Sequence, residues 1–159
     1  MIKLVRIDYR LIHGQVAFAW TRNLDANVIL VANDKAATDE IVKMTLKLAK
    51  PPEVKLAIKT VDDAIKLLNG DKTKPYNVFV IVGNTLDALK LSKGVSEIKS
   101  INVGGLPERE GTWLISKALS IDNNDIKNFE EMESMGIELE VRQVPNEKRK
   151  DIQNLINKR

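Results

Sequence analysis

"IKLVRIDYRLIHGQV", residues 2–16, changes from a strand pattern to a helix pattern across one short loop. Residues 2–8 are rich in aliphatic and β-branched side chains, which favours a β-strand. Between residues 15 and 24, apolar side chains recur at helical spacing, which indicates an amphipathic helix. The loop at residues 9–14 contains the only histidine of the sequence, His13. A strand that leads directly into a helix is typical of the α/β folds.

The same succession repeats along the chain. Strands are expected at residues 2–8, 27–32, 53–58, 77–82, 98–103, 113–121 and 137–144. Helices are expected at residues 15–24, 39–49, 60–70, 85–94, 122–136 and 146–159. The helix at 39–49 places Ile41, Met44 and Leu48 on one apolar face. The alternation predicts an α/β fold with an open, mostly parallel seven-stranded sheet and helices on both faces.

The segment between the fifth and sixth predicted strands is too short for a crossover helix. It reads "GGLPEREGT", residues 104–112, whereas a parallel connection needs a dozen or more residues. We therefore expect a loop or hairpin here, and one later strand that is antiparallel. Gly104 and Gly105 either allow the backbone to approach the first loop closely or bend the chain.

The composition fits a single cytosolic domain. With 159 residues and 43% hydrophobic content, the chain can form one full core, so residues 1–159 are assigned to one domain. The absence of cysteine excludes disulfide bonds, thiolate metal sites and cysteine nucleophiles. The longest apolar runs, such as residues 77–82, are too short to span a bilayer, and residues 1–8 lack the apolar core of a signal peptide. No cofactor is expected.

The charge pattern argues against nucleic acid as a partner. Lys and Arg total 25 and Asp and Glu total 22, a formal net charge of +3, and the two signs are interspersed. Aromatic residues make up 4% of the chain, too few for the stacking that single-strand binders use. A mildly basic surface of this kind suits an acidic or phosphorylated protein partner.

Polar residues at the starts of the predicted helices are interpreted as caps rather than as metal ligands. Asn33 and Asp34 are adjacent oxygen donors without further carboxylates, which rarely hold a divalent ion, so no metal is expected. Asp34 is expected to cap the helix that follows it. Thr60 and Thr85 are expected to be the N-caps of the next two helices.

The first loop holds the residues best suited to phosphoryl transfer. In an open α/β sheet, ligands bind beyond the carboxyl ends of the strands, where this loop lies. The backbone amides of Gly14 and Gln15 begin a helix and can bind an anion. Arg10 can hold two phosphate oxygens with its planar guanidinium. His13 supplies an imidazole, which in its neutral form can attack a phosphoryl group and later leave from it.

Asp8 has a different expected role, because a carboxylate repels phosphate. It precedes Arg10 by two residues, and we expect it to orient Arg10 or the imidazole of His13. Other interpretations of the loop stay open from residue types alone. His13 could be a surface residue or a capping group, or a pH-sensitive contact in a regulatory protein. The loop could also serve a small-molecule binding module, although the phosphate-binding glycine motifs of nucleotide sites do not follow the first strand.

"RIDYRLIHGQVAFAW", residues 6–20, resembles the signature of the IIB component of the mannose/fructose/sorbose family of the bacterial sugar phosphotransferase system (PTS). The resemblance covers nearly the whole chain in order. It continues at residues 27–51, 77–85, 101–112 and 119–148. Two departures from the family pattern are Tyr9, beside the active loop, and "LPEREG" at residues 106–111.

The resemblance implies a protein-N(pi)-phosphohistidine–sugar phosphotransferase. His13 would accept a phosphoryl group from the IIA component and transfer it to a sugar imported through the membrane components IIC and IID, while Arg10 contacts the phosphate. It also implies a fold of seven mainly parallel strands, and a cytoplasmic protein peripherally associated with the inner face of the cell membrane. The sugar, the oligomeric state (including a homo-oligomer), the phosphorylated nitrogen, and the roles of Asn84 and Gly105 in the pocket are left open.

Overall fold

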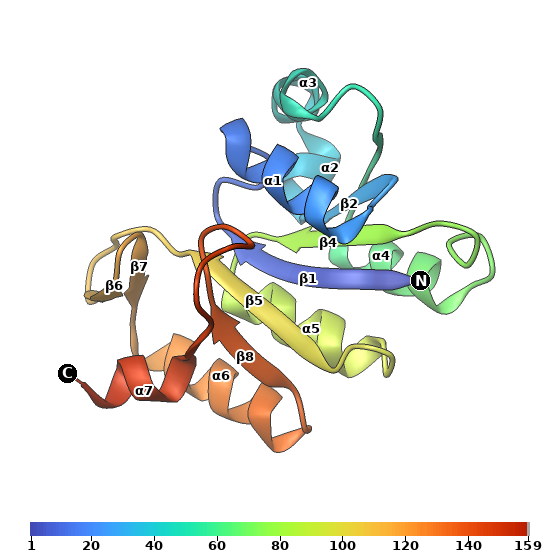
Figure 1. Cartoon of the computed structure of the whole chain (residues 1–159). Coiled ribbons are helices and arrows are strands. Elements are labelled where there is room, and N and C mark those ends of the chain that lie inside the picture. The colour runs from blue at the N-terminus through green and yellow to red at the C-terminus, as the bar shows by residue number, and fades with distance from the viewer. Residues whose placement is uncertain (159) are drawn as a thin grey trace.

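The computed structural model describes residues 1–158 (Figure 1). In chain order its elements are β1 (Ile2–Asp8), α1 (Gly14–Leu24), β2 (Val28–Ala32), α2 (Asp34–Thr38), α3 (Glu40–Ala49), β3 (Lys55–Lys59), α4 (Val61–Asn69), β4 (Val78–Val82), α5 (Thr85–Gly94), β5 (Ser100–Gly105), β6 (Trp113–Ser116), β7 (Leu119–Ile121), α6 (Asn123–Ser134), β8 (Glu138–Val141), β9 (Lys150–Asp151) and α7 (Ile152–Asn157).

The main sheet confirms the predicted fold class. Within residues 1–158 it has seven strands in the order β3-β2-β4-β1-β5-β8-β9, all parallel except for β9, which pairs antiparallel with β8. β1 lies between β4 and β5, with Val5 opposite Val80 and Ile7 opposite Val103. The change of winding direction beside β1 places the loop after this strand where ligands bind in such sheets.

Helices cover the sheet on both faces, as predicted. One core forms beneath α4, α5 and α6, with Phe129 and Met132 among its buried residues. The other forms beneath α1, α2 and α3, around Trp20 and Leu46. Figure 1 shows α1 to α3 on one side of the β1 and β4 pair and α5 and α6 on the other. Along β1, Val5 and Ile7 enter the first core, so the alternate side chains lie on the α1 side.

The later antiparallel strand that the sequence predicts is β9, which pairs with β8, and residues 113–121 do not join the main sheet. Residues 113–121, predicted as one strand, form the separate hairpin of β6 and β7, because the chain turns at Ala118, whose φ is 64°. The seventh strand of the main sheet is β9, within the segment predicted as a helix at 146–159. Only α7 of that predicted helix forms within the described residues, and residue 159 lies outside them.

The helix starts differ from the predicted caps in two places. Asn33 caps the additional helix α2, and Asp34 instead accepts a hydrogen bond from the backbone N of Val61 (2.9 Å). Asn84, rather than Thr85, caps α5 by accepting a hydrogen bond from Asp87 N (2.8 Å). Thr60 caps α4 as predicted.

The predicted apolar face of α3 points to solvent. Ile41, Met44 and Leu48 are exposed, whereas Leu46 is buried in the core beneath α1. Among residues 1–158, the structure has no helix of the length and hydropathy needed to cross a bilayer.

Candidate active site

The loop between β1 and α1 is held in a strained conformation. The backbone N of Leu11 donates a hydrogen bond to the backbone O of Asp8 (3.0 Å), which closes a tight turn. Leu11 has a φ of 61° and Gly14 a φ of 46°, in the left-handed region that costs free energy for a residue other than glycine. Ile12 is 4% exposed and packs into the core beneath α1. Burial of this side chain anchors the strained loop.

The carboxylate of Asp8 lies at the centre of the loop and is fully buried. Its Oδ1 accepts hydrogen bonds from the backbone N (3.1 Å) and Nε (3.0 Å) of Arg10. Its Oδ2 accepts hydrogen bonds from Nη2 of Arg6 (3.1 Å) and Nη2 of Arg10 (3.2 Å). The same Oδ2 lies 3.1 Å from Nε2 of His13. Asp8 therefore contacts both Arg10 and the imidazole, the two groups that were its expected partners.

The ionisation of Asp8 determines which imidazole nitrogen carries a proton. Burial alone would raise the pKa of this carboxyl group, but the hydrogen bond from Arg10 and the charge of Arg6 outweigh it, and the pKa lies below its ordinary value. An ionised carboxylate can only accept hydrogen bonds. The 3.1 Å contact is therefore assigned as a hydrogen bond from Nε2 of His13 to Asp8. In neutral His13 this leaves the lone pair on Nδ1.

His13 and Arg10 remain accessible to a partner. Their side chains are 25% and 31% exposed, respectively. Tyr9 is more exposed, at 44%, and its ring centroid lies 5.3 Å from the guanidinium carbon of Arg10, within the range of a cation–π contact. The open side of the loop therefore presents an imidazole, a guanidinium and an aromatic ring together.

The N-terminus of α1 lies at the same place. His13 is the N-cap residue, and among residues 1–158 no side chain caps this end and no acidic residue stands in its first turn. A Cβ atom at Gly14 would have no neighbour within 4 Å, so space is open in front of this residue. The amides of Gly14 and Gln15 can therefore bind an anion, with the positive end of the helix dipole behind them.

Arg6 contacts Asp8 on the buried side of the site, and the sequence pattern did not identify this residue. Its side chain is buried and binds Asp8, the side-chain Oδ1 of Asn102 and the backbone O of Arg142 (3.0 Å). Burial lowers the pKa of Arg6 from its ordinary value, although the charge of Asp8 opposes the shift. Arg nevertheless remains protonated in proteins. Arg6 is thus a fixed buried cation behind the carboxylate.

The network continues to β8. Nδ2 of Asn102 donates a hydrogen bond to Oε1 of Glu140 (3.1 Å), and Glu140 accepts two hydrogen bonds from Arg142, through Nε (2.9 Å) and Nη2 (3.0 Å). The guanidinium carbons of Arg6 and Arg142 lie 5.5 Å and 5.0 Å from the ring centroid of Trp20 in α1. Polar and aromatic contacts therefore connect the site to the end of β8.

Two glycines of β5 make room for the arginines. A Cβ atom at Gly104 would overlap the guanidinium of Arg6. A Cβ atom at Gly105 would lie 3.0 Å from Nη2 of Arg10 and 3.1 Å from Oδ1 of Asp8. The backbone O of Gly105 also accepts a hydrogen bond from Tyr9 N (3.2 Å). Of the two sequence interpretations, close approach of the backbone is therefore the one that the geometry supports.

Asn84 has a structural role and also lines a cavity. As the cap of α5 it stands at the rim of a cavity of about 500 Å³ that Arg109 and Asp125 also line. Arg109 is tied there by its Nη2, which donates a hydrogen bond to Oδ2 of Asp125 (2.9 Å). Asn84 therefore lines this neighbouring cavity, while Gly105, in β5, contacts the loop that contains His13.

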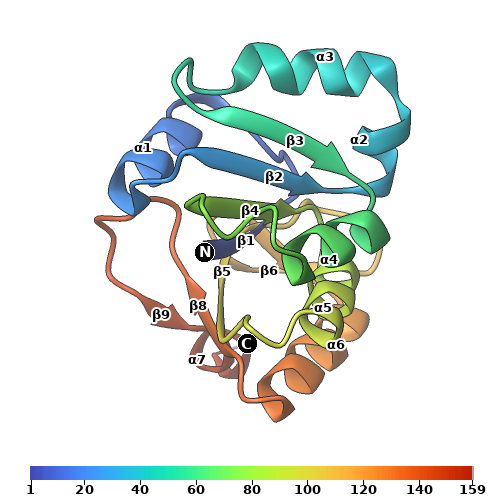
Figure 2. The ribbon, with the colours of Figure 1, turned by 90° about the vertical axis from the view of Figure 1, so that its right-hand side faces the viewer.

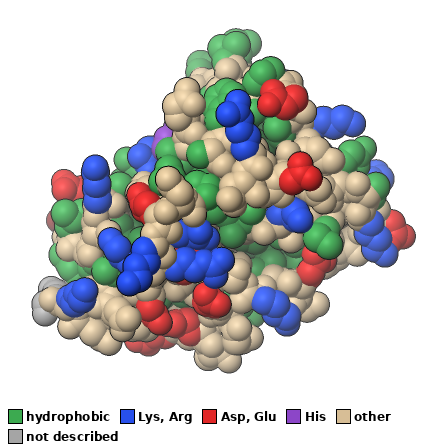
Figure 3. All heavy atoms as spheres, in the orientation of Figure 1, with side chains coloured by type: hydrophobic (Ala, Val, Ile, Leu, Met, Phe, Trp, Pro, Cys, Tyr) green, Lys and Arg blue, Asp and Glu red, His purple; other side chains and the backbone are tan. Residues whose placement is uncertain are grey.

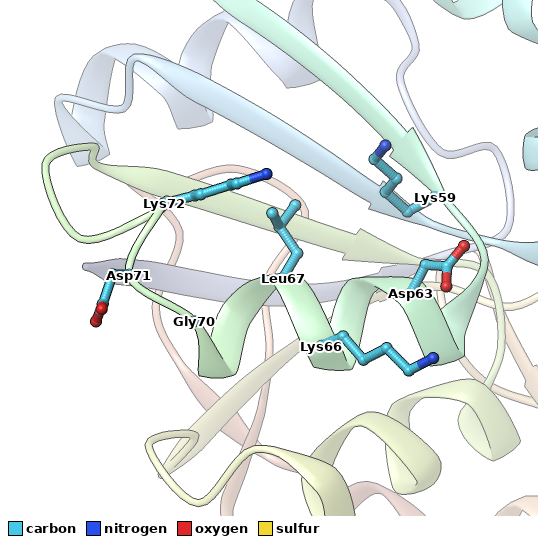
Figure 4. A pocket seen from close by; sticks show the side chains of 7 residues that line it. All are labelled: Lys59, Asp63, Lys66, Leu67, Gly70, Asp71 and Lys72. Atoms are coloured by element: carbon cyan, nitrogen blue, oxygen red, sulfur yellow. The ribbon is translucent and has the colours of Figure 1, made fainter.

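A second cavity lies away from His13, between β3 and α4 (Figure 4). Its volume is about 570 Å³, and its lining residues are Lys59, Asp63, Lys66, Leu67, Gly70, Asp71 and Lys72. The cavity is open to solvent, and Figure 4 shows Asp71 pointing away from Leu67. Among the described residues, no group of three or more His, Asp or Glu side chains is placed to hold a metal ion.

The chain is similar along its whole length to sugar-transport proteins. The family model described as "PTS system sorbose subfamily IIB component" matches residues 2–159. The sorbose-specific EIIB component of Lacticaseibacillus casei is 36% identical over 152 residues, which cover 96% of this chain and 93% of that protein. The IIBSor domain of the sorbose permease from Klebsiella pneumoniae is 32% identical in its crystal structure, with a TM-score of 0.94, and the match covers 99% of this chain and 97% of that one.

Some relatives are longer than this chain. The mannose-specific EIIAB component of Escherichia coli (strain K12) is 37% identical over 158 residues, which cover 99% of this chain and 49% of that protein. The chain therefore spans about half the length of these EIIAB relatives.

Proposed function

Because the chain belongs to the sorbose subfamily of PTS IIB components, we propose that it is the phosphocarrier subunit of a sugar permease. In this proposal His13 accepts a phosphoryl group from a IIA component and transfers it to a sugar that enters through IIC and IID components. The chain then works at the cytoplasmic face of the membrane, associated with these components. The observation that carries the proposal is the contact of one ionised carboxylate, Asp8, with both Arg10 and His13.

The direction of attack follows from the contact with Asp8. Its carboxylate holds the proton on Nε2, so Nδ1 of His13 is the nucleophile. A bond forms from Nδ1 to phosphorus while the bond from phosphorus to the donor breaks, which gives an N(pi)-phosphohistidine. In the second transfer, the oxygen of a sugar hydroxyl bonds to phosphorus as the bond to Nδ1 breaks, the electron pair returns to Nδ1, and the hydroxyl proton is released to solvent. Asp8 contacts the opposite side of the ring, so its charge supports the imidazole without touching the phosphoryl group.

In the transition state of phosphoryl transfer, the negative charge on the phosphoryl oxygens must be stabilised. Arg10 lies beside His13 on the accessible side of Asp8, and the amides of Gly14 and Gln15 follow His13 directly. Asp8 uses Nε and Nη2 of Arg10, which fixes the plane of the guanidinium and leaves Nη1 for the phosphoryl oxygens. Positioning before the reaction lowers the reorganisation cost of the transfer.

The exposed ring of Tyr9 and the open loop suit docking of a protein donor. Relatives are named for sorbose, mannose, fructose and N-acetylgalactosamine, and we propose that the sugar carried by this chain is a hexose or an amino sugar of this kind. Growth of a deletion strain on each candidate sugar identifies the one that depends on this chain.

Labelling tests the carrier role. The purified chain is incubated with phosphorylated IIA donor, and the label is expected to be stable in base and labile in acid, as in a phosphohistidine. His13→Ala should take up no label, while Lys66→Ala, in the distant cavity, should take up as much as the wild type. Label retained in His13→Ala would refute the proposal. Nuclear magnetic resonance of the labelled protein then distinguishes Nδ1 from Nε2.

A further inference from the structure

Helix α3 is apolar on two sides, and only one of them is packed. Ile41, Met44 and Leu48 are 79%, 65% and 83% exposed. Their spacing of three and four residues places them on one side of the helix, here named the α3 crest. The other apolar side, which packs against the core, consists of Val42, Leu46 and Ala49. Large apolar side chains that are exposed singly need no explanation, but a contiguous group of them indicates a binding surface.

The α3 crest is convex. In Figure 2, α3 is the outermost element, beyond β3 at the edge of the sheet. Figure 3 shows hydrophobic side chains at the top of the molecule, where α3 lies in Figure 1. α3 also packs on the same side of the sheet as α1, which begins at the site loop. A partner that covers the crest would thus lie on the α1 side of the molecule.

Lysines accompany the crest along the helix. Lys43 and Lys47 lie four residues apart on the side of the helix next to Met44. Lys50 follows as the C-cap residue, and its Nζ donates a hydrogen bond to the backbone O of Pro51 (3.4 Å). The carboxylates of α3 are confined to its first turn. Asp39 is occupied as the N-cap, and Glu40 pairs with Lys43 (3.4 Å). The remaining turns of the helix therefore combine aliphatic side chains with positive charge.

A second copy of the chain fits this surface poorly. A stable dimer buries about 800 Å² on each partner, which is more than three side chains on one helical ridge provide. Antiparallel packing of two crests would also bring the lysines of both copies together, and like charges repel. A convex aliphatic ridge bordered by lysines matches instead the helices that lie in the interface of anionic bilayers.

We propose that the α3 crest binds the surface of an anionic lipid bilayer. The aliphatic side chains of Ile41, Met44 and Leu48 enter the boundary between headgroups and acyl chains, and Lys43 and Lys47 contact the anionic headgroups. This binding goes beyond the phosphocarrier role, because it needs no phosphoryl group and no protein partner. It adds lipid contacts to the association that the membrane components provide.

Vesicle sedimentation tests this proposal. The full chain is mixed with vesicles of phosphatidylglycerol and phosphatidylcholine, or of phosphatidylcholine alone, and should bind the anionic vesicles more tightly. The triple variant Ile41→Ser, Met44→Ser, Leu48→Ser should bind them at least ~10-fold more weakly. Lys43→Gln and Lys47→Gln should each weaken binding by ~5-fold. The matched control, Leu86→Ser with Leu114→Ser, removes exposed leucines elsewhere and should bind as the wild type does.

Several outcomes overturn the proposal. These are no binding of the wild type, equal binding of the wild type and the serine triple variant, or a dimer in gel filtration that the triple variant abolishes. A protein that binds the crest in place of lipid gives the first of these results. The thermal midpoints of all variants should match the wild type, because the changed side chains are exposed. Labelling of His13 in solution should also be unchanged in every variant, so the outcome is independent of the carrier experiment.

Discussion

Nε2 of His13 lies 3.1 Å from Oδ2 of Asp8, and this carboxylate also binds the guanidinium of Arg10. A single buried anion thereby fixes the tautomer of the proposed nucleophile and the plane of the proposed phosphate ligand. Arg6 lies behind it and contributes a second cation. The accessible groups are thus positioned by groups that are themselves buried.

Asp8→Asn should slow phosphoryl transfer by ~100-fold or more, by analogy with other catalytic histidines that lose the carboxylate fixing their tautomer. Both oxygens of Asp8 accept hydrogen bonds, whereas an Asn side chain offers one oxygen and one amide donor. The side-chain NH₂ of Asn must then face either the Nε2–H of His13 or an N–H of an arginine. Two hydrogen-bond donors are then placed opposite each other. Single-turnover labelling measures the rate of phosphoryl transfer, and Asp62→Asn on α4 is the control. An unchanged rate in Asp8→Asn would show that Asp8 does not orient the imidazole.

Arg10→Lys should lower the transfer rate by ~100-fold, because an ammonium group cannot bind Asp8 through two nitrogens and still offer a third to phosphate. The chain should stay folded, since Arg10 is partly exposed and Arg6 still pairs with Asp8. Arg22→Lys, on the exposed side of α1, is the matched control. If Arg10→Lys transfers as fast as Arg22→Lys, the guanidinium geometry has no role in the reaction.

The sequence was sufficient for the fold class, and it supplied the candidate residues of the site loop, whose roles stay predictions. Alternation of patterns predicted the parallel sheet, and the loop after the first strand contained the expected groups in one short segment. Arg6 was not identified, because a charged residue in a strand is expected at the surface and its buried partner Asn102 lies 96 positions away. Only the paired strands bring such residues together.

Periodicity also has a limit in helices. It placed Ile41, Met44 and Leu48 on one face of α3, but the helix has a second apolar face, and spacing does not show which of the two meets the sheet. The short strand β9 was missed because two residues carry no periodic pattern. β9 forms by pairing with β8, and this pairing exists only in the folded chain.

Gly104→Ala should destabilise the fold by ~3 kcal/mol, since a Cβ atom there overlaps the buried guanidinium of Arg6, which has little room to move. Gly70→Ala is the control, because the nearest atoms to a Cβ at this position are at 3.5 Å and 3.6 Å. Chemical denaturation measures both free energies of unfolding. Equal stability of the two variants would mean that Arg6 can leave its place without cost.

Glu140→Gln should also destabilise the fold by ~3 kcal/mol, because the largely buried guanidinium of Arg142 loses its anion. Glu138→Gln makes the same chemical change two residues away, in an exposed pair with Arg149, and should stay within ~0.5 kcal/mol of the wild type. A comparable loss in both variants would contradict the difference in burial on which this prediction depends.

Acid should remove the stabilisation that Asp8 provides. The pKa of Asp8 is lowered in the folded chain, so its contribution is fully present above the unfolded value of about 4 and is lost as the pH falls through the folded value. The free energy of unfolding of the wild type should therefore exceed that of Asp8→Asn by a constant amount at neutral pH. This difference should shrink below about pH 4.

Asp87 provides a control of opposite sign. Burial and the charge of Asp34 raise the pKa of Asp87, so its folded form binds protons more tightly than its unfolded form. The free energy of unfolding of the wild type should then rise, relative to Asp87→Asn, as the pH falls through the unfolded and folded pKa values. Denaturation curves of the three proteins over the acidic range give both slopes. A difference between wild type and Asp8→Asn that does not change with pH would mean that Asp8 is not stabilised as an anion by Arg10 and Arg6.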